Sequence, residues 1–221
     1  MGAAIGDILG MAVGVAISPV PVIAVILMLF SSRAAANSLS FLAGWVLGLS
    51  AAGLMVLALG VEASSGGDAN GGGVIKIAIG ALFVVLGVRQ WLGRPRGDEE
   101  AEMPGWMATI DDFNAVKSFG LAFLLSAVNP KNLGLTIAAV ASIGASGLET
   151  GEEIGTLTVF VVLASLTVGV PVVVNLILGS KAEHALTEMK DWLVANNNTV
   201  MAVLFVVLGA KVLGDGIAAI T

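Results

Sequence analysis

Six residues, Leu82-Phe83-Val84-Val85-Leu86-Gly87, recur verbatim as Leu204-Phe205-Val206-Val207-Leu208-Gly209. Each copy lies in a long apolar run, and each is followed two positions later by a basic residue, Arg89 or Lys211. A repeat of this kind, preserved with its surroundings, indicates that the chain is a duplicated unit.

Proline interrupts the two halves at corresponding places. Ser18-Pro19 breaks the first apolar run of the chain, and Asn129-Pro130 breaks the first apolar run of its second half. Interrupted helices at matching positions of two halves are typical of membrane transporters whose binding site lies between the halves.

The composition points to a membrane protein. The 221 residues are 57% hydrophobic and only 12% charged, and the mean hydropathy is +0.99. Apolar surface in this amount needs lipid to face it. The net charge of −6 argues against nucleic acid as a partner. The chain has no cysteine and a single histidine, His184, so we expect no disulfide, no metal site, no cofactor and no catalytic residue.

We predict an all-α membrane protein with six transmembrane helices, arranged as two inverted three-helix repeats. The apolar runs long enough to cross roughly 30 Å of hydrocarbon are 6–30, 39–61, 74–93, 118–146, 154–178 and 199–219. Residues 1–93 are the first repeat, 94–117 a linker and 118–221 the second repeat. Because three spans per half is an odd number, the second half enters the membrane from the opposite side.

Basic residues predict the orientation. The connectors after spans one, three and five hold Arg33, Arg94, Arg96, Lys117, Lys181 and Lys190. The connectors after spans two and four hold acidic residues and no Lys or Arg. The positive-inside rule then places the basic connectors in the cytoplasm and both termini outside the plasma (inner) membrane. Within the linker, Trp106, Ile110 and Phe113 have helical spacing, which predicts a short amphipathic helix on the cytoplasmic interface.

Lys131 is the sharpest candidate for function. It lies near the middle of the fourth span, within Asn129-Pro130-Lys131-Asn132. A cation at that depth is costly unless it faces protein, water or a counter-charge. Pro130 removes a backbone donor and frees a carbonyl. Together these groups predict a polar site for an anionic or hydrogen-bonding part of a substrate. The alternative is that Lys131 snorkels toward the membrane surface or forms a purely structural pair.

Ser18-Pro19-Val20-Pro21 is the matching feature of the first span. Two prolines one residue apart delete two donors in the same turn, so a regular helix is not expected there. In the inverted arrangement this break and the one at Pro130 face each other. Pro171 and Asn175 predict a third place, in the fifth span, where a proline and a polar side chain interrupt an apolar helix. We include both among the substrate-binding candidates.

Glycines at four-residue intervals predict close helix contacts. They are Gly2, Gly6, Gly10 and Gly14 at the chain start, and Gly44 and Gly48 in the second span. We expect them to pack within the chain, with a homodimer seam as the alternative. Lys211 and Asp215 are spaced to pair on one helix.

The chain resembles a known family in several segments. These are Ile17 to Ile23, Ser31 to Ala34 followed by Phe41 to Trp45, Trp106 to Asp111, and Asn129 to Leu133. They are similar to the GAP family, the peptidoglycolipid- and sulfolipid-addressing proteins of actinobacteria, within the lysine-exporter superfamily of inverted three-helix repeats. The resemblance implies export of envelope lipids such as glycopeptidolipid or sulfolipid, with Pro19, Pro21, Asn129, Pro130 and Lys131 as site residues.

Two other functions remain open at this point. One is a small-solute exporter of the same superfamily, for amino acids or ions; the scarcity of carboxylates inside the spans argues against a cation pump. The other is a non-transporting membrane scaffold that assembles envelope lipid synthases. The expected partners are therefore an envelope lipid substrate, membrane lipids and envelope lipid synthesis or export machinery.

Overall fold

The computed structural model describes residues 1–59, 69–95 and 105–220, and in these ranges it contains helices and no strand. The predicted all-helical class is confirmed. In chain order the elements are α1 (Gly2–Ala16), α2 (Pro19–Phe30), α3 (Ala34–Ala58), α4 (Ala69–Leu92), the 3₁₀ helix η1 (Gly105–Asp112), α5 (Ala115–Phe123), the π-helix η2 (Leu124–Val128), α6 (Pro130–Gly144), α7 (Thr150–Leu178), the 3₁₀ helix η3 (Gly179–Ala182) and α8 (Glu183–Ile220).

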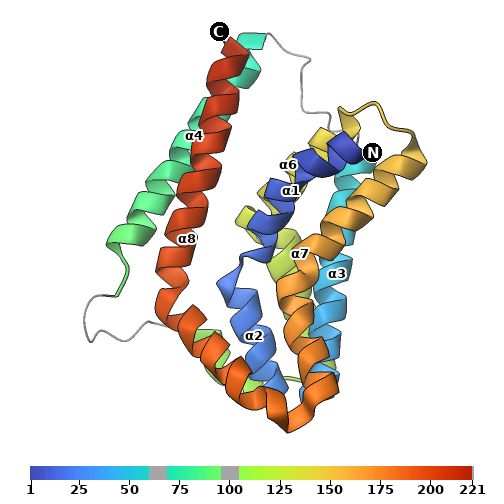
Figure 1. Ribbon diagram of the computed structural model, residues 1–221, viewed down its shortest axis with the longest axis vertical. Coiled ribbons are helices and arrows are strands. Elements are labelled where there is room, and N and C mark those ends of the chain that lie inside the picture. The colour runs from blue at the N-terminus through green and yellow to red at the C-terminus, as the bar shows by residue number, and fades with distance from the viewer. Residues whose placement is uncertain (60–68, 96–104, 221) are drawn as a thin grey trace. The chain divides into compact units, whose positions relative to one another are not determined.

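Packing divides the chain into two compact units. Unit 1 comprises residues 1–63 and 103–193, and unit 2 comprises residues 64–102 and 194–221. Unit 1 therefore contains α1, α2, α3, α5, α6 and α7, whereas unit 2 consists of α4 and most of α8 (Figure 1). These units cut across the halves predicted from the sequence, because each half contributes its last long helix to unit 2.

The described residues contain two to four candidate membrane spans. Ala34–Ala58 and the helical stretch Thr150–Ala218 are each long and apolar enough to cross a membrane. Two bent helix pairs also qualify if each counts as one span: α1 with α2, and α5–η2 with α6. Four of the six runs predicted from the sequence lie mainly within one helix each, whereas 6–30 and 118–146 are each divided between two bent helices. Two to four crossings stand on this measure.

Proline causes both bends. The chain turns by 55° between α1 and α2, where Pro19 begins the second helix, and by 57° between η2 and α6, where Pro130 does so. The lack of an N–H and the fixed φ of proline suit the first turn of a helix and end the helix before it. The two predicted helix breaks are confirmed.

Helices α3 and α7 pack against each other in unit 1 (Figure 1). A Cβ built on Gly53 would lie 2.7 Å from the Leu157 side chain, and one built on Gly169 would lie 3.8 Å from Leu42. The earlier residue of α3, Leu42, is near the later residue of α7, Gly169, and the later residue of α3 is near the earlier one of α7. The two helices are therefore antiparallel. Their largest fully buried side chains are Trp45, Phe41 and Phe160.

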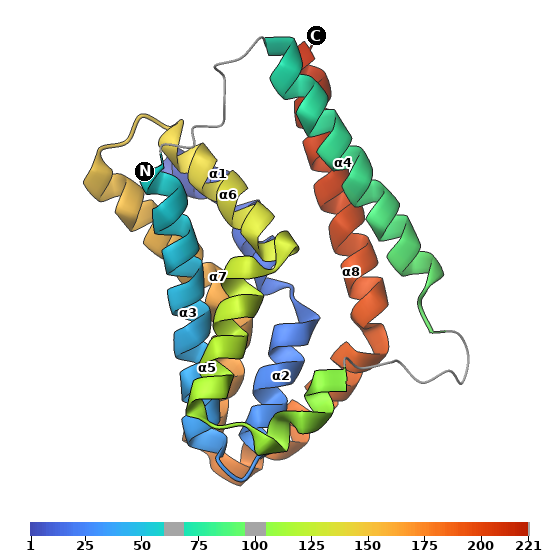
Figure 2. The same cartoon turned by 180° about the vertical axis from the view of Figure 1, so that it is seen from behind.

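Two predicted glycine contacts bring α3 against the second half of the chain. A Cβ on Gly44 would overlap the Phe119 carbonyl oxygen, and one on Gly48 would overlap the Ser126 hydroxyl. Only glycine allows this approach, which lays α3 parallel to α5 and η2 (Figure 2).

The prediction of close packing was wrong for the first three glycines of the chain. Gly2, Gly6 and Gly10 are exposed, and a Cβ on each would meet nothing within 4 Å. Helical spacing places residues on one face but does not say what covers that face, and in α1 the packed face carries Ala4, Ile8 and Ala12 instead.

The remaining contacts of unit 1 follow a regular scheme. Helix α3 packs on α5 and α6, and α7 packs on α1 and α2. Helix α1 also packs on α6. Thr167 bonds to Ala16 and Gly155 lies near Met1, so α1 and α7 are parallel, as α3 and α5 are.

Unit 2 is an antiparallel pair in which the repeated hexapeptides face each other. Phe83 and Phe205, the second residue of each copy, have ring centroids 5.6 Å apart. A Cβ on Gly87 would lie 2.7 Å from Val206, and one on Gly209 would lie 2.8 Å from Val84. Each glycine thus contacts the valine at the third position of the other copy, which is a reciprocal, twofold contact.

The linker before α5 departs in part from its prediction. The described part, η1, is a 3₁₀ helix, and it packs against α2 with Met107 and Ile110 buried. Met107 and Ile110 are therefore directed into unit 1, where the sequence predicted a helix on the membrane interface. The predicted pair on α8 is confirmed: Lys211 Nζ lies 3.4 Å from Asp215.

Candidate functional site

The break between α1 and α2 leaves three successive carbonyls without regular helical donors, and each has a side-chain donor. Pro19 and Pro21 have no N–H to offer the carbonyls of Val15 and Ile17. The Ser18 hydroxyl donates to Val15 O (2.8 Å), Thr167 of α7 donates to Ala16 O (2.6 Å), and Lys131 Nζ donates to Ile17 O (2.8 Å). Two of the three donors come from other helices.

The second break is satisfied mainly by its own residues. The Asn129 side chain caps α6 by accepting from the Lys131 N–H (3.0 Å). The Asn132 side chain reaches back across the break and donates to Leu125 O (2.9 Å). The wider π-helical turn η2 lets the Asn129 N–H reach Leu124 O at 3.1 Å.

Three side chains join the two breaks. Lys131 Nζ donates to the Ser18 hydroxyl at 2.6 Å, and the Ser18 hydroxyl lies 3.3 Å from the Asn132 side-chain oxygen. Ser18 and Asn132 are buried, while Lys131 is partly exposed. We call Ser18, Lys131 and Asn132 the break cluster.

The break cluster holds an amino group without an acidic partner. None of the ion pairs among the described residues includes Lys131. Its electrostatic partner is the C-terminal end of α1, whose carbonyls carry partial negative charge. An ammonium has three N–H donors, and Ile17 O and Ser18 use two. The third is able to bind an oxygen of an anionic or polar ligand.

The structure brings most of the predicted site residues to one place. Pro19, Pro21, Asn129 and Pro130 form the two breaks, and Ser18, Lys131 and Asn132 join them. Pro171 is buried within α7, which continues as a helix through it. Neither Pro171 nor Asn175 contributes a side chain to the hydrogen bonds that join the breaks. Whether these residues bind substrate stays a prediction.

Sequence reasoning missed Thr167. A threonine hydroxyl inside a helix usually bonds to a carbonyl of its own preceding turn, as Thr156 and Thr158 do here. Thr167 lies one turn before Pro171 and instead crosses to α1. Its place in a proline-containing turn was the one available signal.

An apolar groove of about 470 Å³ lies between α3 and α7 in unit 1. Leu42 and Val46 of α3 form one side, and α7 forms the other from Val161 to Val174. Ser165 is the polar side chain in its lining. Leu42 and Gly169, where a Cβ on the glycine would lie 3.8 Å from the leucine, are within this lining.

Comparison with known proteins gives one match. Residues 8–218 match the family model described as Sap, sulfolipid-1-addressing protein. No curated protein and no solved structure matches the chain. The match covers nearly the whole sequence and confirms the resemblance expected from its motifs.

Proposed function

Because the chain belongs to the family of sulfolipid-1-addressing proteins, we propose that it exports an envelope lipid, such as a sulfolipid or glycopeptidolipid, across the plasma membrane. The observation that carries the proposal is the meeting of two proline-broken helices at Lys131. A sulfolipid has an anionic headgroup, and the unused donor of Lys131 is suited to an anionic oxygen.

The packing supports two inverted repeats and six spans. If α1–α2 corresponds to α5–α6, α3 to α7 and α4 to α8, then α3 and α7 run in opposite directions, as do α4 and α8. Contacts within these pairs are reciprocal. Gly53 faces Leu157 while Gly169 faces Leu42, and the hexapeptides repeat this pattern in unit 2.

The distance along the chain between corresponding residues grows in steps. It is 111 residues from Pro19 to Pro130, 115 from Leu42 to Leu157, 116 from Gly53 to Gly169, and 122 from Gly87 to Gly209. The second repeat has therefore gained residues both before α7 and before α8, and not only before α8.

Departures from symmetry support alternating access. Helix α1 packs on α6, but the corresponding pair, α2 and α5, has no comparable contact. The α3–α7 contact is tight at Gly53 and loose at Gly169. Unit 1 is thus closed at the end near Glu149 and open at the end near Lys181. If the Glu149 end opened and the Lys181 end closed, the two repeats would exchange their packing arrangements. A bound headgroup would then move from one side of the membrane to the other.

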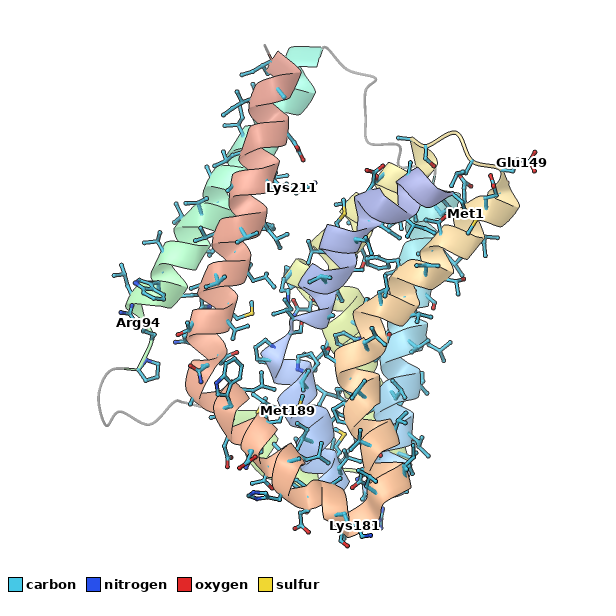
Figure 3. All side chains as sticks on the ribbon, viewed as in Figure 1. Met1, Arg94, Glu149, Lys181, Met189 and Lys211 are labelled. Carbon is cyan, nitrogen blue, oxygen red and sulfur yellow. The ribbon has the colours of Figure 1, made fainter. Side chains whose placement is uncertain are left out.

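The distribution of charge supports the proposed orientation. Glu149, Glu152 and Glu153 lie at one end of unit 1, and Lys181 lies at the other (Figure 3). By the positive-inside rule the Lys181 end is cytoplasmic and Met1 is outside. The open end then faces the cytoplasm, where a lipid made inside the cell is loaded.

The groove favours lipid over a small polar solute. A solute exporter needs a polar vestibule, whereas the groove between α3 and α7 is lined by leucine and valine side chains. The same surface groove also supports a second candidate, a scaffold that holds envelope lipids or their synthases without transporting them.

The proposal is tested by lipid export in cells that lack the native gene. Lys131→Ala should abolish surface lipid at equal membrane abundance, because it removes the donor that joins the breaks. Lys131→Arg should retain part of the export if charge is sufficient, and little if a compact ammonium is needed. Lys190→Ala, which removes the ion pair of a half-buried lysine with Asp191, serves as the control. Normal export by Lys131→Ala would refute the proposed site.

Reconstitution separates the exporter from the scaffold. The purified chain in lipid vesicles should move a fluorescent anionic lipid between leaflets, and Lys131→Ala should not. Vesicles in which the wild-type chain moves no such lipid, while cells still depend on it for surface lipid, would favour the scaffold.

A further inference from the structure

The groove between α3 and α7 has the length of an acyl chain in one leaflet. Its α7 lining runs from Val161 to Val174, which at 1.5 Å per residue is about 20 Å. One leaflet of a bilayer supplies about half of a hydrocarbon core of roughly 30 Å. The groove thus spans one leaflet on the side of unit 1 that carries Lys181.

The groove owes its depth to a glycine. A Cβ on Gly169 would be in ordinary contact with Leu42 at 3.8 Å, so a larger side chain at this position would occupy the space beside Leu42. At the opposite end of the same helix pair, Leu157 already fills the space against Gly53.

Ser165 is the polar side chain of the groove lining, and it is buried. Its side chain is 7% exposed, and its hydroxyl has no hydrogen-bond partner among the described residues. The hydroxyls of Thr156, Thr158 and Thr167 on the same helix all donate to carbonyls. The Ser165 hydroxyl has no such acceptor in the described part of the chain, but its oxygen is enclosed by protein, so the surface that the groove presents is apolar and suits an acyl chain.

Two exposed cations lie at the membrane-surface end of the groove. Arg33 precedes Leu42 by nine residues at the start of α3, about 14 Å along the helix. Lys181 follows Val174 by seven residues, just beyond the end of α7. Neither cation takes part in the ion pairs found among the described residues.

We propose that the groove binds one acyl chain of an anionic lipid from the leaflet at the Lys181 end, with the headgroup held by Arg33 and Lys181. This inference rests on the proposed function in one respect: the bound lipid is the cargo, held beside unit 1 before its headgroup reaches the break cluster. The binding itself is a separate property and is measured without transport.

The test is photo-crosslinking to the purified full-length chain in phosphatidylcholine vesicles. The probe is phosphatidylglycerol with a diazirine in the middle of one acyl chain, and phosphatidylcholine with the same chain is compared with it. Phosphatidylglycerol should label peptides containing Leu42, Val46 and Val162 to Val174 more strongly, by about fivefold for each cation that contacts its headgroup. Free glycerol phosphate in excess should not compete, since it lacks the chain.

Two variants and two controls define the site. Arg33→Gln combined with Lys181→Gln should lower phosphatidylglycerol labelling to the phosphatidylcholine level, whereas Lys117→Gln, an exposed cation on α5, should not. Gly169→Leu should prevent labelling of the groove by both lipids. Gly134→Leu, at an exposed glycine of α6 with no neighbour within 4 Å, should leave it unchanged.

The outcomes separate this inference from the proposed function. Equal labelling by the two lipids, or labelling of α6 as strong as that of the groove, would mean ordinary bilayer contact and would overturn the inference. The charge variants could lose groove labelling while the wild-type chain moves no lipid between leaflets. This result would support lipid binding in the groove and would reject the proposed export function.

Discussion

The two ends of unit 1 both place a leucine of one long helix against a glycine of the other, but they are packed differently. At the Glu149 end, Leu157 would lie 2.7 Å from a Cβ on Gly53, and α1 packs on α6. At the Lys181 end, Leu42 would lie 3.8 Å from a Cβ on Gly169, a groove separates α3 from α7, and α2 and α5 lack the corresponding contact. The same leucine–glycine pair thus forms a closed seam at one end and the wall of a groove at the other.

If the chain has the inverted repeats proposed above, this difference is one of conformation and not of residue type. Both contacts use leucine against glycine, so the sequence allows either end to close. A transporter that alternates between two states needs this property, because its two end states differ mainly in which repeat adopts which packing.

The largest expected effect separates the two ends by their side of the membrane. The chain has no cysteine, so single cysteines placed at Glu149 and Lys181 can be labelled selectively in intact cells. An impermeant maleimide added outside should label Glu149→Cys and leave Lys181→Cys unlabelled until the membrane is opened. Labelling of Lys181→Cys alone would reverse the orientation and place the open end outside.

The second prediction compares the two glycines directly. Gly53→Ala and Gly169→Ala increase helix propensity by the same amount. The difference between the stabilities of the two variants therefore reports how tightly the added methyl group is packed at each position. Gly53→Ala should be less stable than Gly169→Ala by about 1–3 kcal/mol, because its methyl group overpacks against Leu157. At roughly 2–4 °C per kcal/mol for a chain of this size, the melting temperatures of the purified proteins in detergent resolve this difference. Equal melting temperatures would mean that the two contacts are equally tight.

The third prediction concerns the bond by which α7 holds the first break. Thr167→Val keeps the shape of the side chain and removes its hydrogen bond to Ala16 O. We expect a loss of up to about 1.5 kcal/mol, because Ala16 O loses its side-chain donor and keeps only the Ser18 N–H, at 2.8 Å. Thr158→Val, on the same helix with an exposed bond to its own turn, should change stability less. If both variants melt alike, Thr167 does not hold the break.

A smaller effect is expected where the second break is capped by its own residue. Asn129→Ala removes the acceptor for the Lys131 N–H at the start of α6, and replacing a capping residue typically costs about 1 kcal/mol. Asn129→Asp should preserve the cap and the stability. Melting of the two variants side by side checks this, and a loss as large in Asn129→Asp would show that the amide has another role.

The helix breaks were predictable because their cause is local. The missing N–H of Pro19, Pro21 and Pro130 follows from the residue itself, and the three prolines begin or interrupt helices where expected. Lys131 was predictable for a similar reason, since an amino group in an apolar run must find a polar partner. The identity of that partner, the Ile17 carbonyl, followed only from the fold.

Features that depend on which face meets which helix were not predictable. The spacing of Gly2, Gly6 and Gly10 matches that of Gly44 and Gly48, yet only the latter two contact another helix closely. The groove between α3 and α7 is lined by the same leucine and valine residues that line closed seams, so composition carries no sign of it. The hexapeptide predicted that two helices correspond, but not that they contact each other.

The pairing of the two hexapeptides has a consequence for synthesis of the chain. Gly87 is translated 119 residues before Val206, its contact on α8. At roughly 5–20 residues per second, α4 waits on the order of 6–24 s for its partner to emerge. During that interval the glycine-bearing face of α4 has no completed counterpart in its own chain. Assembly of this pair is therefore a late, long-range step, and unit 2 is complete only after α8 has been made.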